Sequence, residues 1–154
     1  MGHVVPWDGW DAREVYRELE HPADRFLEVW APDLEGLLVR ALYALYATMV
    51  EPRAVVARDT LRLHAEGIDP SELLRAVLAE ALYRFDAGGF VAAGATARVA
   101  GDVQGWSGDV DLAGETLDRS RHTTLSEVKA VTYHRLSVRP DDGSGWHATF
   151  ILDL

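Results

Sequence analysis

Two aspartates and the last carboxylate of the chain are the groups best suited to bind a cation. Asp153 stands directly before Leu154, so an aspartate side chain neighbours the terminal carboxylate, and Asp24 lies in a short turn near the start of the chain. Calcium and magnesium are hard cations that bind oxygen, and these three carboxylates could act as their ligands. The alternative is that Asp153 is a solvated residue at the chain end and binds nothing.

Lys129 is the only lysine of the sequence, and every other basic side chain is an arginine. An ammonium is a compact donor on a flexible stem, so it reaches a phosphate or a carboxylate where a planar guanidinium does not fit. In a regular strand, Lys129 shares a face with Tyr133 and Arg135, and the alternating apolar residues face inward. This pattern predicts a lysine that is available to a partner, and a solvated strand residue is the alternative.

Common enzyme motifs give no support for catalysis. The chain has no cysteine, which excludes disulfides, thiolate metal sites and cysteine nucleophiles. Its histidines form neither HExxH nor HxH, no serine lies in GxSxG, and no glycine run has the order of a phosphate-binding loop. His21, His122 and His134 have acidic or hydroxyl neighbours, and we expect hydrogen bonds within the fold rather than catalysis. Zinc hydrolase chemistry and acyl transfer are therefore not supported by the sequence motifs.

Length and composition predict one soluble domain with a sizeable core. The chain has 154 residues, 48% of them apolar and 26% charged. The net charge of -10 repels phosphate backbones, so we expect no direct binding of nucleic acid, although an acidic surface can be steered towards a basic partner. No targeting or membrane-spanning segment is visible, and the lack of cysteine favours the cytoplasm.

The elements that must position these residues follow from periodicity and capping signals. Apolar residues at helical spacing follow Asp33 and continue almost to Pro52, and a second helix opens at DPSE with Asp69 as its cap and ends at Gly88 and Gly89. Strands are predicted at 16–21, 25–31, 54–67, 90–103, 105–114, 128–138 and 145–154. The expected fold is α+β, a single compact domain with two helices packed on a mainly antiparallel sheet.

Four stretches of this chain resemble the archease family. They are RELEHPADRFLEVWA, DPSELLRAVLAEALYRFDAGGFV, RHTTLSEVKAVTYHRLSV and GWHATFILDL, in this order. VKAVTYH, followed by a strand that ends in an Asp-Leu pair, is the specific part, whereas the helix stripes would match many proteins. The resemblance divides the chain into an N-terminal extension, residues 1–14, and an archease-like domain, residues 15–154.

The resemblance implies an accessory protein that activates the GTP-dependent RNA ligase of tRNA splicing, which joins ends through a 3'-phosphate. Archeases are understood to promote guanylylation of the ligase and its multiple turnover. Carried over residue by residue, Asp24, Lys129 and Asp153 are implicated in activation. The resemblance also implies a divalent cation, calcium or magnesium, with Asp24, Asp153 and the carboxylate of Leu154 as candidate ligands.

The sequence departs from the family pattern around the first aspartate. Pro22 replaces the usual Thr, and Arg25 and Phe26 replace small residues, so Arg25 could compete with a cation for the carboxylate of Asp24. Two alternatives from other classes remain open. One is a small metal-dependent hydrolase or phosphotransfer enzyme that uses Asp24 and Asp153, and the other is a chaperone-like binding protein.

Overall fold

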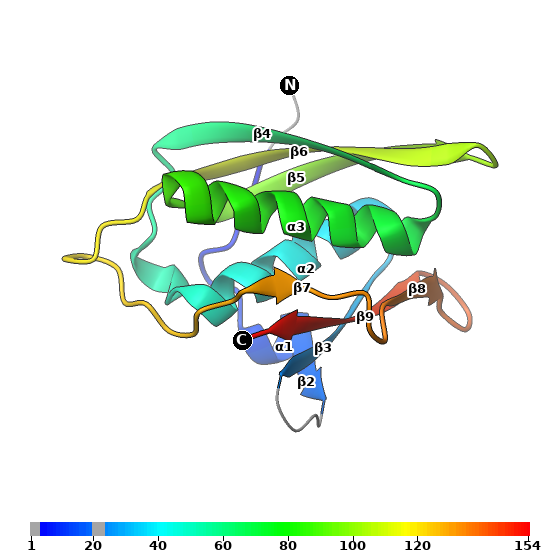
Figure 1. Cartoon of the computed structure of the whole chain (residues 1–154), viewed down its shortest axis with the longest axis horizontal. Coiled ribbons are helices and arrows are strands. Elements are labelled where there is room, and N and C mark those ends of the chain that lie inside the picture. The colour runs from blue at the N-terminus through cyan, green and yellow to red at the C-terminus, as the bar shows by residue number, and fades with distance from the viewer. Residues whose placement is uncertain (1–3, 20–23) are drawn as a thin grey trace.

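Two antiparallel sheets enclose a pair of long helices in this structure, a computed structural model that describes residues 4–19 and 24–154. In Figure 1 the first sheet lies above the helices and the second lies below them. The first sheet has the strand order β1-β5-β6-β4. Its strands are β1 (Val5–Pro6), β4 (Asp59–Gly67), β5 (Phe90–Asp102) and β6 (Gly105–Thr116).

The second sheet carries both ends of the archease-like region. Its order is β2-β3-β9-β7, and β8 pairs with β9 as well. Its strands are β2 (Tyr16–Leu19), β3 (Arg25–Ala31), β7 (Ala130–Val131), β8 (Ser137–Pro140) and β9 (Trp146–Asp153). Because β3 and β9 pair along their full lengths, an early segment of the chain lies beside its C-terminal strand.

The two long helices begin at the aspartates that the sequence marks as caps. They are α2 (Leu34–Met49) and α3 (Pro70–Gly88), beside the short α1 (Ala12–Val15) and the 3-10 helix η1 (Pro52–Ala54). The backbone N–H of Gly36 donates to the carboxylate of Asp33 over 2.7 Å, and that of Glu72 donates to Asp69 over 2.8 Å. Such caps each contribute about 1 kcal/mol to stability because they satisfy backbone donors without an intrahelical partner.

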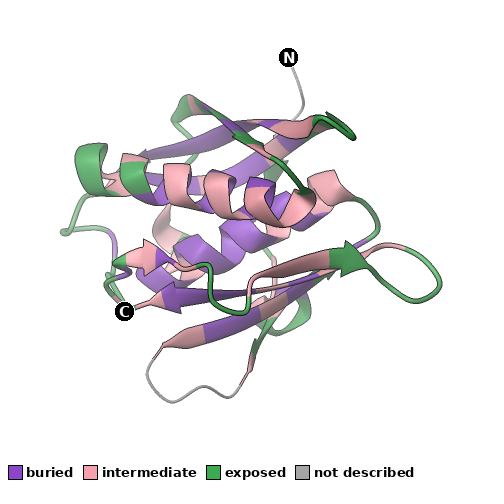
Figure 2. Cartoon of the chain, turned by 45° about the vertical axis from the view of Figure 1, so that its right-hand side comes forward, coloured by how far each residue is buried: buried purple, intermediate pink, exposed green. Residues whose placement is uncertain are grey.

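The core lies around α2, which is buried on almost every side. This helix contacts β5 of the first sheet, β3 of the second sheet and α3, so little of its surface meets solvent (Figure 2). By contrast, α3 buries one apolar stripe and leaves Tyr83 61% exposed. A helix that is apolar all round has to lie in the centre of a domain, and α2 meets this condition.

The α+β class and the single compact domain are confirmed, with the two helices placed between two sheets rather than on one. The predicted strand at 54–67 begins only at Asp59, since η1 ends at Ala54 and residues 55–58 form neither helix nor strand. None of the helices in the described ranges, 4–19 and 24–154, is both long and apolar enough to cross a membrane.

The prediction of one continuous strand at 128–138 is wrong. Two short strands replace it, because Val131 pairs with Leu152 and Ser137 pairs with Thr149 on the same neighbour, β9. Five residues, 132–136, therefore face only two residues of β9, 150 and 151, and the surplus turns away from the sheet. Arg135 adopts a φ of 55° in that turn. The expected common face of Lys129, Tyr133 and Arg135 consequently does not form.

Candidate functional site

Lys129 and Asp153 lie side by side at one end of the second sheet. Asp153 is the last residue of β9, and its Cα partner on β7 is Ala130. The backbone N–H of Lys129 donates to the carbonyl oxygen of Asp153 over 2.7 Å, which extends the β7–β9 ladder by one residue. The two residues are 24 positions apart in the sequence, and this ladder alone brings them together.

Asp24 reaches the same end of the sheet from the other side. The last pair of β3 and β9 joins Arg25 to Leu152, so one step further along the antiparallel register puts Asp24 level with Asp153. Because the strand order is β3-β9-β7, Asp24 and Lys129 flank Asp153 on its two neighbours. Figure 1 shows the chain end beside β7 at this edge of the molecule.

The charged groups at this end of the sheet face solvent. Lys129 is exposed, Asp24 and Asp153 are half-buried, and Leu154, which follows β9, is 37% exposed. Among residues 4–19 and 24–154 the structure records no ion pair for Lys129, Asp24 or Asp153. An exposed ammonium and two half-buried carboxylates at one end of a sheet can meet a phosphate, a carboxylate or a cation from outside the chain.

The segment that leads to Lys129 is fixed to the C-terminus of α2. The backbone N–H of Leu125 donates to the carbonyl of Met49 over 2.8 Å, and that of Ser126 donates to Thr48 over 3.0 Å. Val128 is only 4% exposed, so it anchors the chain directly before Lys129. The lysine backbone is therefore held on both sides, whereas its side chain is exposed.

A buried carboxylate secures the start of this segment. Glu115 of β6 accepts hydrogen bonds from Arg121 over 2.6 Å, from the backbone N–H of Val56 over 2.7 Å and from His122 Nε2 over 2.9 Å. The Arg121 hydrogen bond is the main cause that lowers the pKa of Glu115 to about 2, against the opposing effect of burial. The loop after β6 is thus tied to the first sheet.

His122 has a structural role, as expected from the sequence. Its Nδ1 accepts a hydrogen bond from the backbone N–H of Asp118 over 2.8 Å, so the proton of the neutral ring lies on Nε2 and is donated to Glu115. The side chain is fully buried, which excludes contact with a substrate. His21 and Pro22 lie outside the described residues.

Arg25 does not pair with Asp24 in this structure. Its Nε lies 2.5 Å from Glu18 Oε2 across the β2–β3 hairpin, so this ion pair already occupies the guanidinium. The predicted competition between Arg25 and a cation for Asp24 is therefore not what the geometry shows. Asp24 keeps its carboxylate for other ligands.

Sequence reasoning missed a cation–π pair beside the site. The guanidinium of Arg75, on α3, lies 3.9 Å from the ring centroid of Tyr133, and its Nε donates to the carbonyl of Val131 over 3.0 Å. Tyr133 is 66% exposed. No local sequence signal could show this contact, because Arg75 and Tyr133 belong to elements that only the tertiary fold brings together.

Ser126 and Lys129 have the SxxK spacing that some acyl-transfer enzymes use, but the structure does not support that chemistry. A serine and a lysine at this spacing share a face when the segment is helical. Residues 126–129 contain no helix and run into β7. The pair therefore lacks the local geometry that would let the lysine activate the serine hydroxyl.

Two carboxylates would be available to a metal ion at this site. In the described part of the chain, no group of three or more His, Cys, Asp or Glu side chains lies close enough to hold a metal. The register nevertheless brings Asp24 and Asp153 to the same level on adjoining strands. Their oxygens suit a hard cation, which completes its shell with oxygens from water or a partner.

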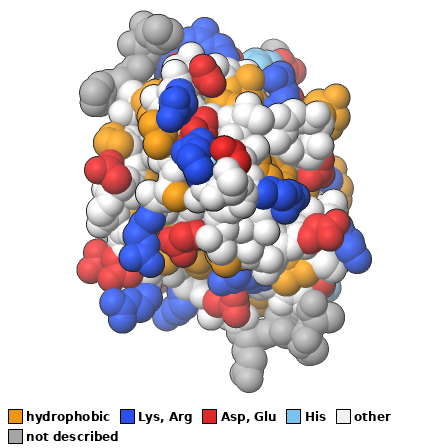
Figure 3. Space-filling view, turned by 90° about the vertical axis from the view of Figure 1, so that its left-hand side faces the viewer, with side chains coloured by type: hydrophobic (Ala, Val, Ile, Leu, Met, Phe, Trp, Pro, Cys, Tyr) orange, Lys and Arg blue, Asp and Glu red, His pale blue; other side chains and the backbone are white. Residues whose placement is uncertain are grey.

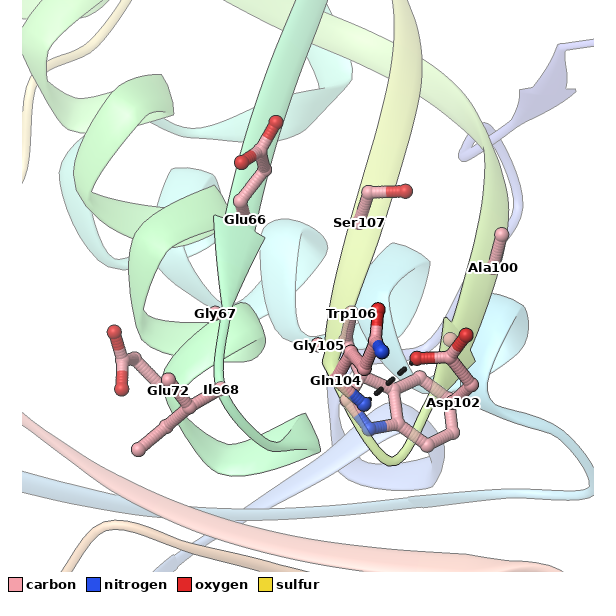
Figure 4. A pocket seen from close by; sticks show the side chains of 11 residues that line it. Glu66, Gly67, Ile68, Glu72, Ala100, Asp102, Gln104, Gly105, Trp106 and Ser107 are labelled. Carbon is pink, nitrogen blue, oxygen red and sulfur yellow. Dashed lines mark hydrogen bonds between the residues drawn. The ribbon is translucent and has the colours of Figure 1, made fainter.

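An open pocket lies elsewhere, between the start of α3 and the β5–β6 hairpin. It has a volume of about 780 Å³ and contains none of the predicted site residues. Figure 4 shows Glu72 and Ile68 on one side of it and Asp102 with Trp106 on the other. Its lining includes three carboxylates and no His, Lys or Arg, so it offers no pairing of base and cation for catalysis.

Charges of both signs are mixed over the surface. On the face in Figure 3, basic and acidic side chains lie interspersed, without a continuous basic stripe. A nucleic-acid backbone would need such a stripe on a protein with a net charge of -10.

Comparison with known proteins identifies the family. A sequence model of the Archease protein family matches residues 16–154. The chain belongs to the archease family. It is 36% identical over 150 residues to Protein archease of Methanopyrus kandleri, across 97% of this chain and 100% of that protein. It is 30% identical to Protein archease of Thermococcus gammatolerans, across 90% of this chain and 98% of the relative.

A solved structure shares the fold of this archease-family chain. The solution structure of Methanobacterium thermoautotrophicum protein 1598 superposes with a TM-score of 0.77 at 25% sequence identity. The match covers 90% of this chain and 98% of that one. Both sequence and fold therefore agree with the resemblance noted from the motifs.

Proposed function

We propose that this archease-family protein activates a GTP-dependent RNA ligase of tRNA splicing and promotes guanylylation and multiple turnover of the ligase. The observation that carries the proposal is the convergence of Asp24, Lys129 and Asp153 on adjoining strands, with the Lys129 N–H bonded to the Asp153 carbonyl over 2.7 Å. These are the residues that the family resemblance implicates in activation. They are far apart in sequence, and their charges are unpaired within the described residues.

The protein acts as an accessory factor, and the bond-forming chemistry belongs to the ligase. Around Lys129 the structure offers an exposed ammonium and two half-buried carboxylates. Such a surface binds charged groups of a partner rather than transforming a substrate of its own. A cytoplasmic location fits this role.

Activation requires that the site bind one state of the ligase more tightly than another. A partner that binds both states equally shifts no equilibrium, however tight the binding. Lys129 supplies a possible difference, because its ammonium can contact a phosphate that is present in only one state of the ligase. A tenfold preference, about 1.4 kcal/mol, changes the population ratio of the two states tenfold.

As part of the same proposal, a divalent cation, calcium or magnesium, binds at this site. Asp24 and Asp153 are the side chains that would hold it, with Leu154 as the third residue expected there. When bound, the ion supplies positive charge that can bridge the protein to a phosphate or carboxylate of the partner. The protein contributes the fixed strand register that keeps the two carboxylates at the same level.

The test is multiple-turnover ligation by the RNA ligase of the same source, with and without this protein. Lys129→Arg keeps the charge and changes the shape of the donor, and Lys129→Ala removes both. The matched control is Arg139→Ala, because Arg139 is a second exposed basic residue, on β8.

We expect the wild type and Arg139→Ala to raise the number of turnovers, and both Lys129 variants to lose at least about tenfold of that stimulation. If the wild type gives no stimulation, the proposed function is wrong for this ligase. If Lys129→Ala stimulates like the wild type, the function stands but Lys129 does not carry it.

A further inference from the structure

A second cavity lies between the N-terminal segment and the domain, apart from the archease site. Its volume is about 360 Å³. Aromatic and aliphatic side chains form most of its wall, among them Trp7, Trp10, Tyr43, Val55, Val56 and Ala93. All five wall residues before Tyr43, at positions 6–10, precede residue 16, where the match to the archease family begins.

The N-terminal wall of this cavity is held in place by the first sheet. The backbone N–H of Trp7 donates to the carbonyl of Ala93 over 2.9 Å, and Pro6 pairs with Gly94. A Cβ at Gly94 would lie 2.5 Å from the carbonyl oxygen of Val5, so only glycine lets the segment approach this closely. Ala93 is the extra residue of a β-bulge in β5, between Ala92 and Gly94, and it faces the cavity.

Three aromatic rings fix one another in the wall. The ring centroids of Trp7 and Tyr43 are 5.6 Å apart at an interplanar angle of 86°, and those of Trp10 and Tyr43 are 5.3 Å apart. Trp7 is only 4% exposed. Edge-to-face and tilted pairs at these distances are attractive, so the rings form a rigid surface that does not need a ligand to order it.

The charged residues at the cavity contribute little to the polarity of its inner wall. Asp8 and Arg53 are among its lining residues, but the Arg53 side chain is 91% exposed and pairs with Glu51 over 3.2 Å. The inner surface is therefore apolar and aromatic. Such a surface favours flat rings, which stack on or pack edge-on against Trp and Tyr, over ions or flexible polar groups.

The size of the cavity also limits the occupant. A dry apolar cavity of about 150 Å³ is large enough to bind benzene. This cavity has more than twice that volume and lies within the usual range of small-molecule pockets, about 300–1,000 Å³. One ring, or two fused rings with small substituents, would fill it.

We propose that this cavity is a binding site for an uncharged planar aromatic ring system of one or two fused rings. The site is separate from Lys129, Asp24 and Asp153, so it does not depend on activation of a ligase. An aromatic ligand would contact Trp10, whose ring packs on the buried Tyr43, and would tie the N-terminal segment more tightly to the domain.

The experiment uses 5-fluoroindole as the probe and the full-length protein. Fluorine NMR titration measures its affinity, and amide chemical shifts of the protein locate it. We expect saturable binding with a dissociation constant of about 1 mM or lower. Amide shift changes should be confined to the lining residues that carry an N–H, which are 7–10, 43, 53, 55–57 and 93.

Two variants and one control test the assignment. Trp10→Ala removes one wall of the cavity, and Val56→Phe fills part of it with a larger side chain. Val56 is 45% exposed, so we expect the Val56→Phe variant to fold. Each should weaken binding by about tenfold or more, whereas Trp30→Ala, at a 36% exposed tryptophan outside the cavity, should not. Absence of saturable binding, equal affinity in every folded variant, or shift changes elsewhere on the protein would overturn the proposal.

Discussion

Two charged regions of this protein differ in how their charges are compensated. Glu115 is buried and accepts hydrogen bonds from Arg121, His122 and a backbone N–H, so its charge holds a loop to a sheet. At the end of the second sheet, Asp24 and Lys129 lie on either side of Asp153 in the strand order, and none of the three has an ion pair within the described residues. The comparison teaches that paired buried charge here stabilises the fold, whereas unpaired exposed charge is left for a partner.

The largest expected effect concerns the buried side of this comparison. Glu115→Ala should lower the free energy of unfolding by about 3 kcal/mol, because it leaves His122 and the Val56 N–H without their acceptor. Urea unfolding followed by circular dichroism measures this. Glu80→Ala, which breaks the surface pair with Arg84, should cost no more than about 0.5 kcal/mol. Equal losses of unfolding free energy in the two variants would show that the buried charge pair stabilises the fold no more than the surface pair does.

Acid should act on the same buried group. The pKa of Glu115 falls from 4.5 to about 2 in the folded protein, so its stabilising contribution is complete above pH 4.5 and is lost as the pH falls towards 2. The difference in unfolding free energy between the wild type and Glu115→Gln should therefore be greatest near neutral pH. We expect it to shrink over this window, and a difference that stays constant down to pH 2 would contradict the assignment.

Cation binding should depend on the exposed region instead. Asp153→Asn should weaken calcium binding by at least about tenfold, or 1.4 kcal/mol, since it removes one of the three carboxylates proposed to hold the ion. Calorimetric titration with calcium chloride measures the affinity. Asp142→Asn changes an exposed aspartate in the β8–β9 loop and should leave it unchanged. Calcium affinity that is the same in all three proteins would remove the cation from the proposal.

The smallest effect on stability should come from the residue with the largest role in activation. Lys129→Ala should change the free energy of unfolding by less than about 0.5 kcal/mol, because the side chain is exposed and only its backbone N–H is engaged. The same variant should lose stimulation of the ligase. If the free energy of unfolding fell by more than about 1 kcal/mol, which is typical of a destabilising mutation, Lys129 would have a structural role instead.

Local signals in the sequence were sufficient for the two long helices and for part of the sheet, but they did not predict α1 or η1. Asp33 and Asp69 cap the helices at the predicted positions, because capping depends on residues within one turn. The break at 132–136 could not be predicted, since it arises from the register of two short strands on β9. The contact of Arg75 with Tyr133 also depends on tertiary packing.

The residues of the candidate site could be predicted from the sequence, but their arrangement in space could not. The family resemblance named Asp24, Lys129 and Asp153, but the strand order that brings them together follows from long-range pairing of β3, β9 and β7. Trp7 and Trp10 lie outside the resemblance, and their packing on Tyr43 emerged only from the fold.

The interrupted strand beside β9 has a further consequence, for solubility and self-association. A long, regular edge strand offers a row of unpaired backbone groups that a second chain can extend. Here that edge consists of β7 with two residues and β8 with four, separated by a turn. The sheet can therefore present its charged end to a partner while offering other copies only a short template for strand addition.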